Sequence, residues 1–285
     1  MDFTRNIVVG YDDTMASAAA VRWAAHLARS SGTGLRIVHA WSWPLLSSGL
    51  AGLPVADSAG PRNQATRLLE DAAATVSLLV PEITVQTDLI PGTARDVLDD
   101  LSQTAELVVV GTRGLGPVMG ALLGSVSRGI LHDAGCPVAV IRSEHHVGGP
   151  VLVAYDGSEA AGEAVDVAAD LAGTWDSRLR IVHVRDDEHA PYDQVAEAWN
   201  GGARSRGLLD EAAERARTAH DGLTVETRML EGRSAADGLL TAAAGARILV
   251  MGHRGLTRGA FGSTAHATVL HATGNIAVVR RPSDE

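Results

Sequence analysis

The chain has 285 residues, of which 46% are hydrophobic, and its formal net charge is −10 at pH 7. This length suits one large domain or two of ordinary size, and no apolar run reaches the ~20 residues that a membrane-spanning helix needs. The acidic balance argues against nucleic-acid binding, because Arg280 and Arg281 are too few to form a basic patch. The start of the chain has no signal-peptide pattern and Cys136 is the single cysteine, so we expect a soluble, cytoplasmic protein without a disulfide framework.

Lysine does not occur in the sequence, and all 24 basic residues are arginines. GC-rich codon usage is a sufficient cause. The consequence for function holds whatever the cause. A phosphate loop of the Walker type, a kinase of the usual kind and a Schiff-base enzyme all need a lysine, so these three classes are excluded.

The chain contains one pattern twice, about 140 residues apart, which is the size of a domain rather than of a solenoid repeat. Residues 8–28 match residues 152–172, and the segment LRIVH begins at both Leu35 and Leu179. We therefore predict a first domain at 1–145 and a second at 148–285, joined by the polar, Gly-rich stretch around 143–150.

Each copy alternates short apolar runs with helical patterns. In the first copy the runs are typical of strands covered on both faces, and they lie near 5–11, 35–41, 83–90, 106–111 and 137–142. This alternation predicts an α/β fold with two tandem open five-stranded parallel sheets and helices on both faces of each. In such sheets ligands bind beyond the carboxyl ends of the strands, where the strand order reverses.

Two long segments interrupt this pattern after the second strand of each copy, at 41–61 and 185–205. They are rich in Pro, Gly and Ser and are long for loops of this type. We expect mobile flaps or contact surfaces beside the ligand edge, with plain surface loops as the alternative.

A glycine-rich loop follows the fourth strand of the first copy. Gly111 and Gly114 are followed by Gly124 and Ser125, where the next helix begins. Glycines allow backbone N–H groups to approach an anion, and a helix N-terminus favours phosphate through its free N–H groups and its dipole. The structural alternative is an ordinary turn with a Ser125 helix cap.

The second copy repeats the loop with a shorter second interval. Gly252 and Gly255 keep the first spacing, but Gly262-Ser263 follows after six intervening residues where the first copy has nine. The amides of this tighter loop cannot all occupy the positions that the first copy gives them.

With these residues the chain resembles the universal stress proteins in their tandem form. The first copy matches the motif G-x2-G-x9-G-[ST] of the ATP-binding branch in full, and the second departs from it in the shortened gap. The resemblance extends over nearly the whole chain twice, and includes the aspartate after strand one and the closing CPVAVIR.

The resemblance implies a set of nucleotide-binding positions in each copy. The aspartate meets the nucleoside end, the residue after the strand-two histidine lines the adenine pocket through its backbone, and the residues of the glycine-rich loop meet the ribose and phosphates. In the first copy these positions are Asp12, Ala40, Val110, Gly111, Gly114, Gly124, Ser125 and Val126. In the second copy they are Asp156, Val184, Met251, Gly252, Gly255, Gly262 and Ser263, with Thr264 as a further candidate. The shortened loop places the phosphate part of the second set in doubt.

Several of these residues have simpler explanations. Asp12 and Asp156 follow an apolar strand and suit a helix cap as well as a ligand contact. Cys136 precedes a buried-looking strand, which indicates an inert, packed thiol. The pair at 145–146 is expected to be a solvated linker rather than a metal site, and no metal-ligand spacing occurs in the sequence. The near matches to a dinucleotide fingerprint and to G-x-S-x-G lack required residues.

The predicted function is binding of an adenine nucleotide, ATP with or without magnesium, as a stress-response regulator or sensor. The resemblance implies that the two domains pack as a pseudo-dimer through their last strands, AVIR and AVVR. The sequence leaves open whether whole chains form a homodimer. The alternatives are a slow ATPase, for which Arg113 and Arg254 offer charge but no general base is evident, and a ligand-free interaction module.

Overall fold

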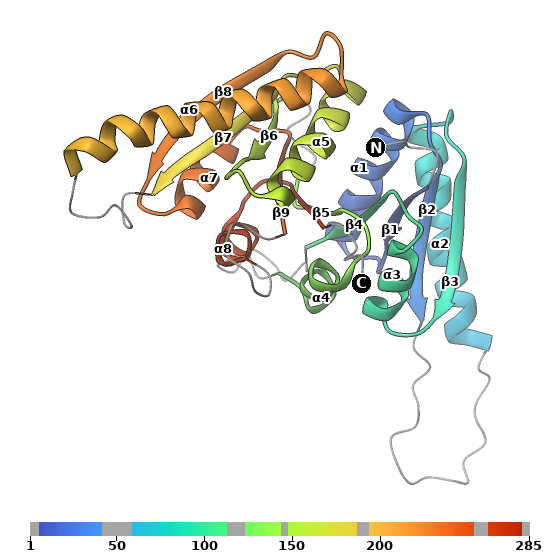
Figure 1. The fold of residues 1–285 in the computed structure, drawn as a ribbon. Coiled ribbons are helices and arrows are strands. Elements are labelled where there is room, and N and C mark those ends of the chain that lie inside the picture. The colour runs from blue at the N-terminus through green and yellow to red at the C-terminus, as the bar shows by residue number, and fades with distance from the viewer. Residues whose placement is uncertain are drawn as a thin grey trace, which may run out of the picture.

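A computed structural model of the chain describes residues 6–41, 59–112, 123–143, 148–186, 194–253 and 262–280. Strands and helices alternate through both halves (Figure 1). The first half contains β1 (Ile7–Gly10), α1 (Met15–Ser31), β2 (Leu35–Trp41), α2 (Ala59–Leu79), β3 (Val85–Pro91), α3 (Ala94–Ser102), β4 (Leu107–Gly111), α4 (Ser125–Asp133) and β5 (Val138–Ile141). The second half contains β6 (Val151–Ala154), α5 (Glu159–Thr174), β7 (Leu179–Asp186), α6 (Gln194–Ala219), β8 (Val225–Gly232), α7 (Ala235–Ala243), β9 (Ile248–Gly252), α8 (Ser263–His271) and β10 (Ile276–Val279).

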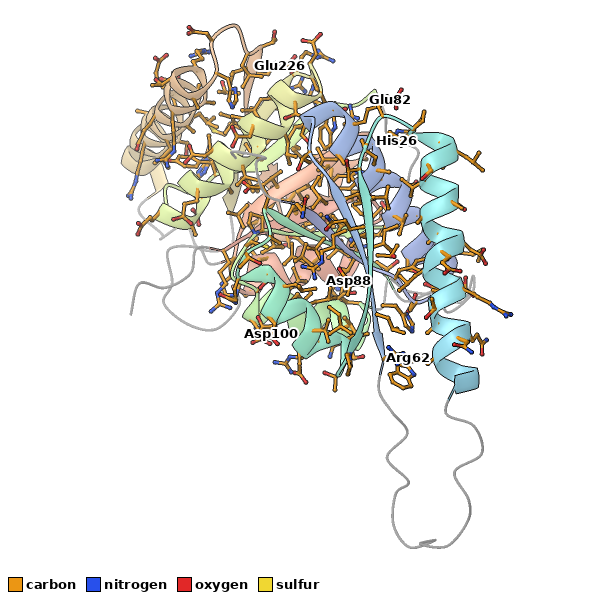
Figure 2. All side chains as sticks on the ribbon, turned by 90° about the vertical axis from the view of Figure 1, so that its right-hand side faces the viewer. His26, Arg62, Glu82, Asp88, Asp100 and Glu226 are labelled. Atoms are coloured by element: carbon orange, nitrogen blue, oxygen red, sulfur yellow. The ribbon has the colours of Figure 1, made fainter. Side chains whose placement is uncertain are left out.

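The strands form one ten-stranded sheet in the order β3-β2-β1-β4-β5-β10-β9-β6-β7-β8. Every described pairing within a half is parallel, as the alternation of strands and helices predicts. In each half the strand order reverses beside the first strand, between β1 and β4 or between β6 and β9. β3 is one edge of the sheet, with α2 packed beside it, and Figure 2 looks onto this end with Asp88 labelled.

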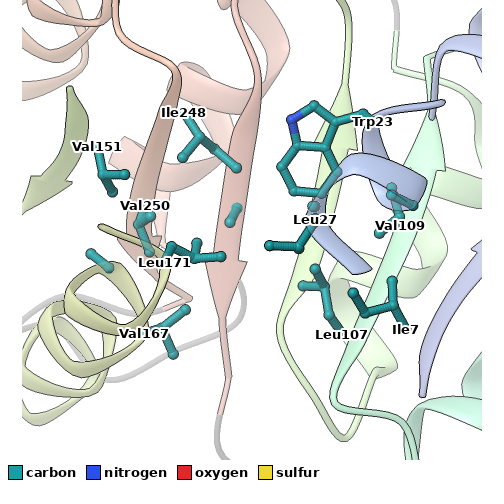
Figure 3. Packing of buried hydrophobic residues seen from close by; sticks show 14 of the residues in the cluster. Ile7, Trp23, Leu27, Leu107, Val109, Val151, Val167, Leu171, Ile248 and Val250 are labelled. Carbon is teal, nitrogen blue, oxygen red and sulfur yellow. The ribbon is translucent and has the colours of Figure 1, made fainter. Parts of the chain in front are cut away.

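The central strands are buried on both faces, which explains why they read as continuous apolar runs. Alternate side chains enter two hydrophobic cores. One core, which includes Ile7 and Val9, lies under α1, α2, α5 and α6. The other, which includes Val8, lies under α3, α4, α7 and α8. Figure 3 shows that the first core continues across the junction, with Leu27 and Leu107 on one side and Leu171 and Val250 on the other.

The two halves meet through their last strands, which confirms the predicted pairing of AVIR with AVVR. β5 and β10 are antiparallel, and Ala139 lies opposite Ala277 at the centre of the pairing. Antiparallel pairing of two equivalent strands generates a local pseudo-twofold axis. The two predicted five-stranded sheets are therefore continuous.

One predicted loop is partly wrong. The stretch at 185–205 was expected to lack secondary structure, but β7 continues to Asp186 and α6 begins at Gln194. Two adjacent glycines in that stretch oppose helix formation, and packing of the rest of α6 on α5 and the sheet overrides this weak local preference. Most of the segment at 41–61 lies outside the described residues.

Within the described ranges, every helix is too short or too polar to cross a bilayer.

Candidate functional site

A pocket lies at the carboxyl ends of β1, β2 and β4, where the strand order reverses. This is the position at which parallel sheets bind ligands. Its far side is formed by the first turns of α1, α3 and α4. The lining residues are Gly10, Tyr11, Asp12, Thr14, Ser17, Val38, His39, Ala40, Ala94, Leu98, Val110, Gly111, Thr112, Gly124, Ser125, Val126 and Ser127.

Asp12 sits in a turn between β1 and α1 and is not the helix cap. Thr14 is the N-cap of α1, and its hydroxyl accepts a hydrogen bond from the Ser17 amide at 3.1 Å. The Asp12 carboxylate accepts from the hydroxyl of Thr14 at 2.7 Å and from its amide at 3.3 Å. Burial opposes ionisation of Asp12, but hydrogen bonds from Thr14 and Ser17 outweigh it and lower the pKa of this carboxyl. Asp12 is therefore an anion at neutral pH and presents an acceptor to the pocket.

His39 forms the wall of the pocket at the end of β2. Its Nδ1 lies 2.7 Å from the carbonyl oxygen of Tyr11, which can only accept, so the proton is on Nδ1. The equivalent His183 makes the same bond to Tyr155 at 2.8 Å. This repeated contact ties the end of the second strand to the end of the first and gives both histidines a structural role.

Gly111 is required by a close approach of two backbones. A Cβ added to it would lie 2.5 Å from the carbonyl carbon of Ala16, in the first turn of α1. In the second half, a Cβ on Gly252 would lie 2.8 Å from the carbonyl carbon of Ala160. These distances are shorter than real Cβ contacts, so glycine at the end of β4 and of β9 first serves the packing of the strand on the helix.

The N-terminus of α4 lines the pocket, and no side chain of the described residues caps it. Gly124 is the N-cap residue, with φ −62° and ψ 159°. Ser125 is the first helical residue and is exposed, so it does not cap the helix. The first-turn N–H groups and the helix dipole therefore offer a site for an anion.

Ser127 fixes this helix end to the sheet. Its side chain is buried, and its hydroxyl donates a hydrogen bond of 3.0 Å to the Gly111 carbonyl. Among the described lining residues none is arginine, so an anion bound here would meet amides and hydroxyls rather than a cation.

The structure brings seven of the eight predicted first-copy residues together around this pocket, and Gly114 lies outside the described residues. Arg113, Arg254, Gly255 and the pair at 145–146 also lie outside them. Sequence reasoning missed several lining residues on the helix first turns. The Thr14 and Ser17 spacing carried a usable signal, because such residues three apart before an apolar run mark a helix start. The lining residues that were not predicted are Gly10, Tyr11, Thr14, Ser17, Val38, Ala94, Leu98, Thr112 and Ser127.

The equivalent positions of the second half share the placement of the aspartate and of the helix start, but differ in side chains and in one backbone bond. Asp156 accepts from the Ser158 amide at 2.9 Å, and Ser158 is the N-cap of α5, so here too the aspartate is not the cap. Val184 takes the place of Ala40, and its γ-methyl group would lie 2.8 Å from a Cβ on Gly238. Gly262 is the N-cap of α8, with Ser263 as its first residue, as at the start of α4.

The start of α8 is also bonded differently from the start of α4. The Gly262 amide donates to the His253 carbonyl at 3.1 Å. Ala265 replaces the buried Ser127, so the hydroxyl tie to the strand is missing. Within the described parts of the chain, no group of three or more His, Cys, Asp or Glu side chains is arranged to hold a metal ion.

The universal stress protein family model matches residues 4–142 and 149–280 of the chain. A universal stress protein of Mycolicibacterium smegmatis is 32% identical over 288 residues, covering 96% of both proteins. One of Mycobacterium tuberculosis is 38% identical over 189 residues, and that match spans 64% of its length. A universal stress protein from Archaeoglobus fulgidus superposes with a TM-score of 0.68 at 18% identity, covering 97% of this chain and 98% of that one, which shows a shared fold. The chain belongs to the universal stress protein family and carries the family's domain twice in tandem.

Proposed function

We propose that the first domain binds an adenine nucleotide, ATP with or without magnesium, and that the chain acts as a nucleotide-dependent regulator in a stress response. The observation that carries this proposal is the pairing of opposite chemistries across one pocket. An ionised acceptor, Asp12, and the N-terminus of α4, which no described side chain caps, both line this pocket.

The sugar and the phosphates of a nucleotide are chemically complementary to these two parts of the pocket. The sugar hydroxyls donate hydrogen bonds, which the Asp12 carboxylate accepts, and a carboxylate at that position disfavours a phosphate there. The phosphates are anions and suit the amides of Gly124, Ser125 and Val126 at the helix start. The resemblance of Gly111, Gly124 and Ser125 to the motif of the ATP-binding branch selects ATP from among nucleotides.

Binding is favoured over turnover. Hydrolysis needs a positioned base or water together with charge stabilisation. In the described part of the pocket no arginine is present to stabilise developing charge, and the Asp12 carboxylate already accepts two hydrogen bonds from Thr14. We therefore expect that the bound nucleotide is a signal rather than a substrate.

The test is Gly124→Ala, measured by calorimetric titration with ATP, ADP and adenosine. The backbone of Gly124 has a negative φ that alanine adopts without strain, so the fold is retained. The added Cβ intrudes at the anion site, and we expect about a tenfold loss of ATP affinity, equal to ~1.4 kcal/mol, with adenosine affinity unchanged.

The matched control is Gly262→Ala, at the N-cap of α8. We expect it to change ATP binding less than Gly124→Ala, because the Gly262 amide is already bonded to His253. Unchanged ATP affinity in Gly124→Ala would refute the assigned phosphate position, and a larger loss in Gly262→Ala would reverse the ranking of the two domains.

A further inference from the structure

The helix that carries the proposed anion site depends on tertiary contacts for its position. α4 has nine residues, fewer than an isolated helix needs to be stable in water. Ile130 and Leu131 bury its inner face in the core, and side-chain bonds are present at both of its ends. At the N-terminal end, Ser127 is bonded to Gly111. At the C-terminal end, the carboxylate of Asp133 is bonded by the Arg95 guanidinium of α3, with Nε at 2.8 Å.

The second domain adds two contacts at the same C-terminal end. The guanidinium of Arg280, just after β10, donates a hydrogen bond to the carbonyl oxygen of His132 in the last turn of α4. The ring of His253, just after β9, packs edge-to-face on the His132 ring, with centroids 6.4 Å apart and planes at 86°. A cation there satisfies a carbonyl that has no partner within the helix and complements the negative end of the helix dipole.

The equivalent helix of the second domain, α8, shares only part of the described contacts of α4. Arg142, the counterpart of Arg280, donates to the Val269 carbonyl of α8, so this contact is present in both directions across the pseudo-twofold axis. The other ties of α4 have no counterpart, since Ala265, Ala236 and His271 stand where the first domain has Ser127, Arg95 and Asp133.

The start of α8 in the second domain also has a backbone hydrogen bond that the described residues do not provide at the start of α4. The His253 carbonyl receives the Gly262 amide at 3.1 Å, and that amide is equivalent to the Gly124 amide at the proposed phosphate site. Among the described residues, the Gly124 amide has no such bond. The His253 carbonyl therefore accepts from the Gly262 amide, the group that would donate to an anion in the second domain. The His253 ring packs against His132 of the first domain.

We propose that the second domain acts as a brace for the first, by which we mean that its contacts fix the position of α4. Arg280 and His253 are the positioning residues, and they hold the N-terminus of α4 in place for the phosphates of the nucleotide. This inference rests on the proposed function for its ligand, but the brace itself can be observed without one. In this proposal the second domain raises the nucleotide affinity of the first domain's site, and it is not a second site of equal affinity.

The test compares Arg280→Ala with Arg142→Ala in the full chain. Both substitutions remove an arginine that crosses the pseudo-twofold axis, but only Arg280 contacts α4. We expect Arg280→Ala to weaken ATP binding about three- to tenfold, in the range of one helix-end interaction. Adenosine affinity should be unchanged, and Arg280→Lys, which keeps a charged donor, should restore part of the loss. Arg142→Ala should lower the melting temperature without this selective loss.

The second readout is hydrogen exchange of the α4 amides in the protein without ligand. Arg280→Ala and His253→Ala should accelerate exchange in α4, and Arg142→Ala should accelerate it in α8 instead. His253→Phe, which keeps the edge-to-face contact, should leave α4 protected.

The outcomes separate the two proposals. If the wild-type protein binds no nucleotide, the proposed function fails, and the exchange pattern alone decides whether the brace exists. If Arg280→Ala and Arg142→Ala change α4 exchange equally, or lower ATP and adenosine affinity by the same factor, the brace is overturned.

Discussion

The side chain of Asn275 ties the end of the first domain to the second, and replacing it with alanine tests how that junction is held. Asn275 is 3% exposed. Its Oδ1 accepts from the amides of Arg142 at 2.9 Å and Ser143 at 3.1 Å. Its Nδ2 donates to the carbonyls of Ser143 at 2.8 Å and Arg247 at 3.4 Å. The equivalent residue of the first domain is Pro137, so this tie exists in one direction only.

The expected cost of Asn275→Ala follows from these four bonds. Three have good geometry, and each contributes about 1 kcal/mol net to stability, so their loss costs ~3 kcal/mol. The fourth, at 3.4 Å, is long and adds little. The amides of Arg142 and Ser143 lose their acceptor in a partly buried setting, and this raises the cost if water does not reach them.

Urea unfolding followed by far-UV circular dichroism and by tryptophan fluorescence measures this change. Two of the five tryptophans, Trp23 and Trp175, pack edge-to-face across the junction with ring centroids 5.8 Å apart, so part of the fluorescence signal reports on the junction. We expect the free energy of unfolding to fall by ~3 kcal/mol, with the fluorescence transition at lower urea than the dichroism transition if the junction opens first. A loss below about 1 kcal/mol with coincident transitions would refute the reasoning, because it would mean that water replaces the Asn275 side chain.

Three further substitutions test other parts of the structure. Thr268→Val should raise the free energy of unfolding by about 1 kcal/mol in urea titrations, because the Thr268 hydroxyl is buried without a hydrogen-bond partner among the described residues; a loss would show that the hydroxyl is bonded. Ala40→Val should cost about 1–3 kcal/mol by overpacking, and much less when combined with Val97→Gly, since the second domain has Val184 with Gly238 at these positions; additive costs would contradict this pairing. Burial raises the pKa of the Cys136 thiol to about 12. The native thiol should therefore resist alkylation at pH 8, and stability should fall as pH rises from about 9 toward 12, because the unfolded chain releases this proton first. Cys136→Ala should reduce that alkaline loss, and an unchanged slope would count against the buried thiol.

The fold could be predicted from the sequence because its signals are local and repeated. Parallel strands buried on both faces leave continuous apolar runs, and the duplication shows each run twice. The pairing of AVIR with AVVR followed from the resemblance and is confirmed by Ala139 opposite Ala277. The loop predicted at 185–205 was partly wrong, because the weak preference of glycine against helix competed with packing that the sequence does not display.

The residues of the candidate site could be predicted from the sequence only in part. Most of the motif residues gather around one pocket, since the carboxyl ends of β1, β2 and β4 must meet at one edge of the sheet. The reason for Gly111 was only partly visible. A loop glycine suggests contact with an anion, but its Cα faces the backbone of Ala16, a segment nearly a hundred residues earlier.

The sequence by itself determined two α/β domains of one family and a glycine-rich loop at the edge of the first sheet. Only the tertiary structure decided how the two domains contact each other. The Arg280 bond to His132 joins residues 148 positions apart, and the Asn275 bond to Arg142 joins residues 133 positions apart. Such contacts leave no periodicity or motif in the chain, because they depend on where a whole domain places the end of a strand relative to a helix of its neighbour.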